Sequence, residues 1–408
     1  MNIIIINHYA GSPQFGMEFR PYYLAKEWTK LGHFVTIIAA DFSHLRKQQP
    51  ILKQKNEQQN IDGINYIFFK TPKYKGNGKD RVLNMFSFVR QLTQKAKKIA
   101  KTINPNAVIA SSTYPADVYP ARKIAKIAKA KLIFEIHDVW PLTPMELGGF
   151  KKWHPFIATL QYFENYAYKY SNAVVSILPN TLQHCQEHNL KKEKWYHIPN
   201  GIVIDEWKEF QDIPQQHKEI IEKLKQTEKK IIGYVGGHAI SNALNILIDT
   251  AKLMENQTQF AFVLIGDGPQ KQNLIQQAQN LKNVFFLPPV AKNSVPALLK
   301  MFDFLYIGWN KSKLYRFGIS PNKVYDYMMS AKPIIHSVDA ANDDVALAKC
   351  GISVEAQNPK AIYKAIIELS NKSQQEIAQI GENGKKYVLQ NNDYSVLAKK
   401  FLEVIENC

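Results

Sequence analysis

The sequence predicts an α/β protein with two domains, each built on a parallel β-sheet with helices on both faces. Three observations lead to this prediction. The chain has 408 residues, more than one hydrophobic core usually spans. Short apolar runs alternate with amphipathic segments, which is typical of parallel sheets because each crossover between parallel strands needs a long connection. The alternation starts again in the second half, so we expect two such sheets.

In the first half, a strand is expected at residues 3–7, where the continuous apolar run 3–6 is of the type that is buried on both faces of a sheet. After a loop at 9–16, an amphipathic segment at 17–31 ends at Gly32, a favoured helix stop. Further strands are expected at 35–39, 65–69, 107–111, 132–137 and 173–178, with helical stretches between most of them.

The second half predicts six strands and four helices in tighter alternation. The strands are expected at 231–235, 260–265, 284–287, 304–307, 333–337 and 352–354, and the helices at 243–255, 270–281, 295–301 and 321–330. The hydrophilic stretch 206–230 separates the halves. We therefore expect domains at 1–200 and 201–390, with a closing helix in 391–408 that returns to the first domain.

Charge and cysteine content limit the class of protein. The net charge is +17, and residues 1–200 hold 28 Lys and Arg against 13 Asp and Glu, so nearly all the excess lies in the first half. Nucleic acid, an anionic membrane or a polyanionic substrate would each fit such a surface. The three cysteines have no paired spacing, which supports neither a zinc site nor a disulfide framework. No signal peptide or apolar run of about 18 residues is seen, so we expect a cytoplasmic protein, at most bound to a membrane surface.

Two loops of the second half have the character of ligand sites, because parallel sheets bind ligands beyond the carboxyl ends of their strands. One contains Gly266, Asp267 and Gly268 after a buried strand, where glycines let the backbone approach a ligand. A tight strand-to-helix turn needs the same residues. The other, Gly236 and Gly237 followed by His238, could receive a diphosphate through backbone N–H groups.

The segment from Gly318 to Asp326 is more specific. We expect Ser320 to be an N-cap, Pro321 the first helical residue, and Asn322 and Lys323 part of the first turn. A lysine there opposes the helix dipole unless an anion lies nearby, and a phosphate would resolve the conflict. Asp326, one turn later, can accept hydrogen bonds from two ribose hydroxyls. The alternative is an ordinary capped helix with a solvated lysine.

In the first half, His137 and Asp138 end a buried strand. His137 could bond a sugar hydroxyl or a developing charge, and Asp138 could orient its imidazole or lie behind the residues that contact the substrate. Gly16 and Glu18 follow the first strand and are further site candidates, although Gly16 could simply serve the turn.

Taken together, these residues resemble the retaining family-4 glycosyltransferases of GT-B architecture, in which two Rossmann-like domains face each other across a cleft. The resemblance covers essentially the whole chain and is closest to bacterial enzymes that assemble O-antigen, capsule and exopolysaccharide. The matching motifs are NHYAGSPQFGMEFRP at 7–21, HDVWP at 137–141, PNG at 199–201, GDGP at 266–269 and SPNK at 320–323.

The resemblance implies that the second domain binds a nucleotide sugar, with UDP as the expected carrier, and the first binds the acceptor. Asp326 matches the second acid of the family's Glu-x7-Glu signature, while Gly318 stands in place of the first. Gly237 and Asn242 stand near the usual basic diphosphate clamp, so we expect Lys323 to replace it. His137 matches the histidine beside the transferred sugar. The expected catalytic residues are His137, Lys323 and Asp138, and the expected binding residues are Gly16, Glu18, Gly236, Gly237, His238, Gly266, Asp267, Gly268, Val290, Gly318, Ile319, Ser320, Pro321, Asn322 and Asp326.

The implied reaction is transfer of a hexose, N-acetylated or deoxy, with retention of configuration, to a polyprenyl-diphosphate-linked saccharide in surface polysaccharide biosynthesis. No cofactor and no metal are expected, and no Asp-x-Asp motif is present. Basic residues at 70–81 and 95–101, on a segment with an apolar stripe at 85–99, suit anionic lipid headgroups and predict an enzyme peripheral to the inner face of the cytoplasmic membrane. The alternative is a solvated helix whose stripe faces the core.

Two rival functions remain at this level. A sugar-nucleotide epimerase or hydrolase would use the same nucleotide site without an acceptor. A nucleic-acid-binding protein is suggested by the positive charge alone, since no helix-turn-helix, RNA-recognition or zinc-finger signature accompanies it. We therefore expect no nucleic-acid partner.

Overall fold

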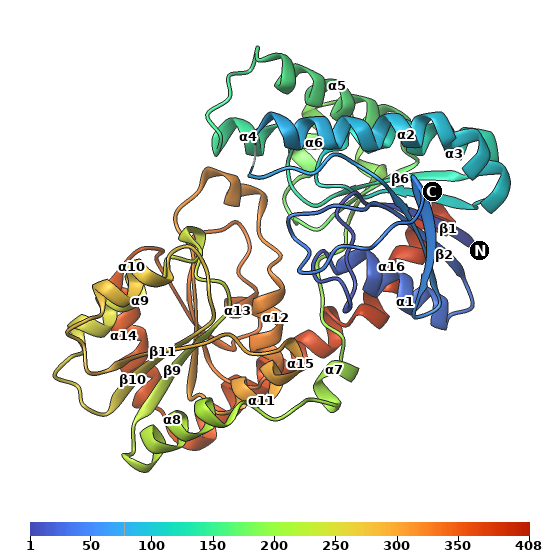
Figure 1. Cartoon of the computed structure of the whole chain (residues 1–408). Helices are drawn as coiled ribbons and strands as arrows, with labels where there is room; N and C mark the ends of the chain where they lie inside the picture. Colours follow the sequence, from blue (N-terminus) through green and yellow to red (C-terminus); the bar gives the residue numbers. More distant parts are fainter. Residues whose placement is uncertain (77) are drawn as a thin grey trace. The chain divides into compact units, whose positions relative to one another are not determined.

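The computed structural model describes residues 1–76 and 78–408 and divides into two compact units, shown in Figure 1. The first unit consists of residues 1–200 together with 394–408, and the second of residues 201–393. Each unit is built around its own β-sheet, with helices packed against it. The α/β class predicted from the alternation of apolar runs is therefore confirmed in both halves.

The sheet of the first unit has eight strands in the order β3-β4-β2-β1-β5-β6-β7-β8. All neighbours pair in parallel except β3 and β4, which are antiparallel. The strands are β1 Asn2–Ile6, β2 Phe34–Ala40, β3 Asn56–Ile61, β4 Ile64–Phe69, β5 Ala107–Ala110, β6 Lys131–Ile136, β7 Ala173–Ser176 and β8 Trp195–His197. The order reverses between β1 and β5, so the loops after these strands flank a ligand-binding position.

Strands β3 and β8 were not predicted, because neither has an apolar pattern. β3 reads NEQQNI and lies at the sheet edge, where polar side chains face water. β8 has three residues at the opposite edge. Edge strands are held by backbone pairing to a single neighbour, and this leaves little signal in the sequence.

Helices cover both faces of the first sheet. They are α1 Arg20–Lys30, α2 Lys79–Ile103, α3 Val118–Ala128, α4 Leu142–Glu146, α5 Pro155–Tyr170, α6 Leu182–Glu187 and α16 Tyr394–Asn407. In Figure 1, α2, α3 and α5 lie along one side, and their apolar residues join one core with the strands. The closing helix α16 packs on α1, where the Trp28 indole N–H donates to the Ala398 carbonyl at 2.9 Å.

The apolar stripe of α2 faces the protein core. Phe88 and Leu92 are fully buried among residues of α3 and the strands, and Met85 is nearly buried in a smaller cluster with Tyr114 and Leu160. The alternative in which the stripe faces the core is therefore confirmed, because most of its apolar residues are used in packing. Phe86 and Leu83, on the outer side of the first turns, remain exposed.

The second unit has six parallel strands in the order β11-β10-β9-β12-β13-β14. Counted within the unit this is 3-2-1-4-5-6, the doubly wound order of dinucleotide-binding folds. The strands are β9 Lys230–Val235, β10 Phe260–Ile265, β11 Val284–Leu287, β12 Phe304–Gly308, β13 Ile334–Ser337 and β14 Gly351–Val354. The order reverses between β9 and β12, so the loops after β9, β10 and β12 form the expected ligand edge.

The helices of the second unit are α7 Asp205–Lys208, α8 Gln215–Gln226, α9 Leu244–Leu253, α10 Lys271–Gln277, α11 Val295–Lys300, α12 Asn322–Met329, α13 Asp344–Leu347, α14 Pro359–Ser370 and α15 Gln374–Asn391. The hydrophilic stretch at 206–230 does not mark the boundary between units. It forms most of α7 and all of α8, whose Ile221 and Leu224 are buried in the core of the second unit, so the polar residues are the outer face of a packed helix.

No helix within the described residues combines the length and apolar character that crossing a bilayer would require.

Candidate functional site

A buried hydrogen-bond network lies at the carboxyl edge of the first sheet. Glu135, near the end of β6, accepts from Ser111 Oγ at 2.6 Å and lies 3.0 Å from His137 Nε2 through Oε2. Ser111 Oγ also lies 2.9 Å from His137 Nε2. The other carboxylate oxygen, Oε1, is 2.9 Å from both Nε and Nη2 of Arg20. The structure thus brings the predicted His137 into contact with Glu135 of β6 and with Ser111 after β5, and Glu135 connects it to Arg20 of α1.

The charges of this network are paired inside the protein. Burial alone would raise the pKa of Glu135, but the Arg20 guanidinium, aided by His137 and Ser111, lowers it to about 2. Arg20 also donates to the carbonyls of Ile198 and Pro199 at 2.9 and 2.6 Å. One guanidinium therefore fixes both the Glu135 carboxylate and the backbone at 198–199, just before the chain enters the second unit.

Asp138 does not orient the imidazole, and this interpretation of the sequence is wrong. Its carboxylate accepts from Thr143 Oγ1 at 2.6 Å, from the Val139 N–H at 2.9 Å and from the Trp140 indole at 3.3 Å. These bonds order the turn that leads into α4. The residue that contacts the imidazole is Glu135, which stands two positions before His137 on the same side of the strand.

Gly16 forms part of a turn, which is one of the two alternatives that the sequence left open for it. Its N–H and carbonyl both bond to Ser12, at 2.7 and 3.1 Å, and its φ of +100° suits glycine. The Glu18 backbone bonds to Gly11 and Tyr9, which closes the loop after β1. The side chain of Glu18 is half-buried at the same edge.

In the second unit, the loops after β9 and β10 touch backbone to backbone. A Cβ on Gly266 would lie 1.9 Å from the Gly236 carbonyl oxygen, and one on Gly268 would lie 2.7 Å from the His238 oxygen. Gly236, Gly266 and Gly268 all have positive φ. The His238 N–H donates to the Asp267 carbonyl at 2.8 Å, which ties the two loops together. Glycine is therefore required here by close packing.

His238 is fully buried, yet neither ring nitrogen has a hydrogen-bond partner in the described part of the chain. Burial, together with the charges of Lys271 and Lys323, lowers its pKa to about 4, so the ring is neutral at pH 7. The Lys271 ammonium lies in the same corner and donates to the Gly266 carbonyl at 2.8 Å. An unpaired buried imidazole costs stability and marks a position where a ligand can supply the missing bond.

Lys323 extends from the first turn of α12 to the end of β9. Its ammonium donates to the Tyr234 hydroxyl at 2.6 Å and lies 4.1 Å from the centre of that ring. A Cβ on Gly236 would lie 2.7 Å from Nζ, so the absence of a side chain there admits the lysine. Burial lowers the pKa of Lys323 to about 7, which Asp326 only partly opposes. Within residues 1–76 and 78–408, no carboxylate forms an ion pair with it.

Helix α12 begins one residue later than predicted. Pro321 occupies the cap position and Asn322 is the first helical residue, with no side-chain cap, so Ser320 is not the N-cap. Ser320 Oγ lies instead 3.4 Å from the Tyr325 hydroxyl. Pro321 has ψ of 127°, an extended value that a cap residue adopts and a helical residue does not. Lys323 remains in the first turn, so its conflict with the helix dipole stands.

The remaining predicted residues of this unit have different environments. The Ile319 N–H and carbonyl are both bonded to the Asn342 amide, at 2.7 and 3.1 Å, so this backbone is already satisfied. Gly318 precedes it with φ of +87°. Burial raises the pKa of Asp326 to about 6, against the opposing effects of Lys292 and Trp207. Gly237, Asp267 and Asn322 are exposed, and Val290, beyond the end of β11, is half-buried.

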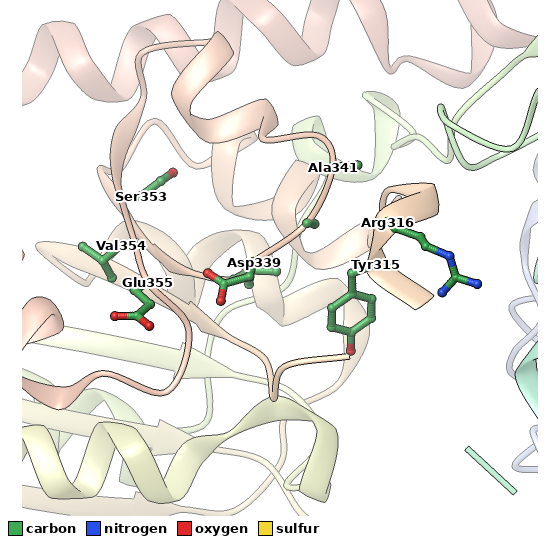
Figure 2. A pocket seen from close by; sticks show the side chains of 9 residues that line it. Tyr315, Arg316, Asp339, Ala341, Ser353, Val354 and Glu355 are labelled. Carbon is green, nitrogen blue, oxygen red and sulfur yellow. The ribbon is translucent and has the colours of Figure 1, made fainter. Parts of the chain in front are cut away.

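A separate hollow of about 580 Å³ lies beyond the ends of β13 and β14 (Figure 2). Asp339 and Glu355 line it and pair with Lys311 at 3.5 and 2.7 Å. In Figure 2 the guanidinium of Arg316 extends away from these carboxylates. None of the predicted site residues lines this hollow, and its acidic side chains disfavour a diphosphate.

One group of side chains in the described ranges has ligand types suited to a metal ion: Glu164, His184 and His188 of the first unit. The Glu164 carboxylate already accepts from Tyr168 and Gln161 and lies 2.8 Å from His184 Nε2. These bonds account for the buried Glu–His pair by themselves.

Sequence reasoning missed Arg20, Ser111, Tyr234 and Lys271 as site residues. Arg20 and Glu135 are 115 positions apart, so no local pattern connects them. Tyr234 lies within an apolar strand, so nothing in the local sequence distinguishes it from a core residue. Lys271 offered a signal, because it begins the helix that follows the predicted glycine loop.

Comparison with known proteins agrees with this architecture. The profile of Glycosyltransferase Family 4 matches residues 16–206, and that of Glycosyl transferases group 1 matches residues 229–372. A search of curated proteins finds no match.

Several solved structures share the fold. Anabaena HepE in complex with UDP and glucose is 16% identical with a TM-score of 0.67, and 100% of each chain is covered. A glycosyltransferase from Rickettsia africae is 16% identical with a TM-score of 0.70, covering 99% of this chain and 97% of that one. WaaG, a glycosyltransferase involved in lipopolysaccharide biosynthesis, is 13% identical with a TM-score of 0.66, covering 99% of each.

The two profiles together span most of the chain and meet near the boundary between the two doubly wound units. The first half of the chain therefore matches a Family 4 domain and the second half a group 1 domain, and the chain is a nucleotide-sugar-dependent glycosyltransferase of GT-B fold.

Proposed function

We propose that this enzyme transfers a hexose from a UDP-linked donor, with retention of configuration, to a lipid-linked saccharide at an anionic membrane surface. The second unit would bind the donor and the first the acceptor. The hexose would be N-acetylated or deoxy, as in the surface polysaccharides made by the enzymes that the sequence resembles.

The observation that carries the donor site is the partly buried ammonium of Lys323. It lies in the first turn of α12, beside the glycine loops that follow β9 and β10, and has no acidic partner among the described residues. A diphosphate placed there would supply the missing negative charge and meet the backbone N–H groups of the helix start. Transition-state charge on the leaving diphosphate would be stabilised by the same group.

His238 supports the same position for the donor. Its two unpartnered ring nitrogens lie in the corner shared with Lys271 and the Gly266–Gly268 loop. One N–H of a neutral imidazole can donate to a phosphate oxygen. Asp326 would hold the ribose, as the family signature implies.

UDP is proposed as the carrier because solved relatives of the same fold are complexes with UDP, with UDP-glucose or with UDP-2-fluoro glucose. Retention and independence from a divalent metal come from the family resemblance. Unchanged turnover after removal of divalent cations by a chelator is the expected result, and reactivation by added Mg²⁺ or Mn²⁺ would contradict it.

The membrane proposal rests on the charge of one helix layer in the first unit. Helices α2, α3 and α5 carry eleven Lys and Arg but only Asp80 and the buried Glu164 as acids. Beside them, Trp153 is 77% exposed and Leu147 68%, in the connection between α4 and α5 that also holds Lys151 and Lys152. Cations attract anionic headgroups, and exposed Trp and Leu can enter the interface.

Flotation with vesicles tests the membrane contact. We expect binding to phosphatidylglycerol vesicles, weak binding to phosphatidylcholine vesicles, and loss of binding in Trp153→Ala with Leu147→Ala. Ile240→Ala, which removes an equally exposed apolar side chain from the second unit, is the matched control. Failure of the native chain to float with either lipid would end this part of the proposal.

The donor is tested by thermal stability in the presence of UDP-, GDP- and dTDP-hexoses, because a ligand that binds the folded state raises the melting temperature. We expect the largest rise with a UDP-hexose, and product linkages that keep the donor's anomeric configuration. Efficient turnover of the nucleotide sugar without an acceptor would favour an epimerase or hydrolase instead.

A further inference from the structure

The hydrogen-bond network of the first unit determines which nitrogen of His137 is available to a substrate. Nε2 lies 3.0 Å from Glu135 Oε2 and 2.9 Å from Ser111 Oγ. Nδ1 has no protein partner within the described residues, and the side chain is 11% exposed. The ring is therefore held by one nitrogen and presents the other.

The proton on Nε2 follows from the acceptors around it. Glu135 is ionised, and a carboxylate can only accept hydrogen bonds. Ser111 uses its hydroxyl hydrogen toward Glu135 Oε2 at 2.6 Å, so its oxygen is left to accept. Both neighbours of Nε2 are thus acceptors, which places the hydrogen of a neutral imidazole on Nε2 and a lone pair on Nδ1.

Arg20 keeps this arrangement in one orientation. Its two bonds to Oε1 leave Oε2 as the oxygen that faces His137. The same guanidinium is anchored on the carbonyls of Ile198 and Pro199, so it cannot follow a rotation of the carboxylate. A lysine could not make these divergent bonds.

We infer that His137 contacts its substrate through Nδ1, as the acceptor of a hydrogen bond from a sugar hydroxyl, and that Glu135, Ser111 and Arg20 are positioning residues that fix this tautomer. The inference rests on the proposed function, because it takes the sugar to lie beside His137. Beyond the proposed function, it identifies Nδ1 as the atom that contacts the sugar and names the residues that fix the tautomer.

Two substitutions separate the nitrogens of the ring. The amide of Asn reaches about as far as Nδ1, and that of Gln about as far as Nε2. We expect His137→Asn to keep a kcat/KM about tenfold above that of His137→Gln, the equivalent of one hydrogen bond. Equal losses, or a Gln variant more active than the Asn variant, would overturn the inference.

The tautomer of His137 can be measured by NMR, independently of enzyme activity. In long-range ¹H–¹⁵N spectra of the full chain, assigned by the loss of signals in His137→Asn, we expect His137 to carry its proton on Nε2. In Glu135→Gln, one amide oxygen cannot serve Arg20 and His137 at once, so the proton should shift to Nδ1. A native ring protonated on Nδ1 would contradict the inference.

Glu164→Gln is the matched control, because Glu164 is an equally buried glutamate that lies 2.8 Å from the Nε2 atom of another histidine, His184. It should leave the His137 signals unchanged. A chain that transfers no sugar to any acceptor but shows the Nε2 tautomer would refute the proposed function alone. Sugar transfer with indistinguishable Asn and Gln variants would refute this inference alone.

Discussion

The carboxyl edges of the two sheets have similar strand topology but differ in how their polar groups are paired. In the first unit the polar groups pair with one another: Arg20 with Glu135, and Glu135 with His137. In the second unit they are unpaired: Lys323 has a phenol as its partner, and His238 has none among the described residues. Side chains build the first edge, whereas closely packed glycine backbone builds the second.

This difference separates an edge that is complete without a ligand from one that is not. A paired charge network holds its geometry in the free protein and suits a group whose orientation must be fixed. A partly buried cation without a counter-ion and a buried imidazole without a hydrogen-bond partner cost stability in the free protein, and a bound anion relieves that cost. The second edge is therefore the one expected to respond to an anionic donor.

The largest effect is expected from breaking the paired edge. Glu135→Ala leaves the buried Arg20 guanidinium without its carboxylate, which should cost about 3–5 kcal/mol of unfolding free energy in urea titrations. Glu135 has a lowered pKa, so its stabilisation is complete above its ordinary pKa of about 4.3 and is lost as the pH falls toward 2. The variant should lack this part of the acid dependence. A cost below about 1 kcal/mol, as for an exposed pair, would show that the network is not rigidly paired.

Removing the unpaired cation should affect turnover more than stability. Lys323→Ala is expected to lower kcat by roughly ten- to a thousandfold, because an electrostatic contact to the leaving group is lost. Its melting temperature should not fall, since the substitution removes a partly buried ammonium that has no counter-ion. Lys252→Ala, on the exposed side of α9, is the control and should turn over normally. Near-native kinetics in Lys323→Ala would remove this residue from the mechanism.

Two glycine substitutions in the loops after β9 and β10 are expected to have smaller effects and form a matched pair. Gly266→Ala would place a methyl group 1.9 Å from the Gly236 oxygen and force a positive φ on alanine. We expect a loss of about 1–3 kcal/mol of unfolding free energy in urea titrations. Calorimetric titrations with UDP should also show weaker binding. In Gly237→Ala the new Cβ would meet its nearest neighbour at 4.0 Å, so both quantities should change little. Equal effects of the two changes would argue against close loop packing.

The sequence predicted the residues at the carboxyl edge of the second sheet better than those at the carboxyl edge of the first. The glycine loops and the helix start at Lys323 could be predicted because local backbone rules determine them, apart from a one-residue error at Ser320. The network of Arg20 and Glu135 could not, because folding brings together residues far apart in the chain. Asp138 was misassigned for the same reason: a neighbour in sequence was preferred to Glu135, which lies on the same face of the strand.

Long-range packing, which local patterns do not reveal, also explains the wrong predictions about the fold. The stripe on α2 has a helical period that both a core-facing and a membrane-facing helix show, and the packing of Phe88 decides between them. The polar residues at 206–230 resemble a linker until α8 is seen to bury Ile221. Patterns along the chain predicted most of the apolar strands and amphipathic helices, but not the polar edge strands, the helix α8 or what the elements pack against.

Calorimetric titration with UDP at pH 8, in two buffers of different ionisation enthalpy, tests the central claim most directly. Burial lowers the pKa of Lys323 to about 7, so the free enzyme holds it largely neutral at pH 8, and a diphosphate that binds the charged form must draw in a proton. The account predicts proton uptake in the native chain, an affinity that falls by up to about tenfold for each pH unit above 7, and loss of both in Lys323→Ala. Equal UDP affinity in the native chain and the variant, with no proton exchanged, would contradict it.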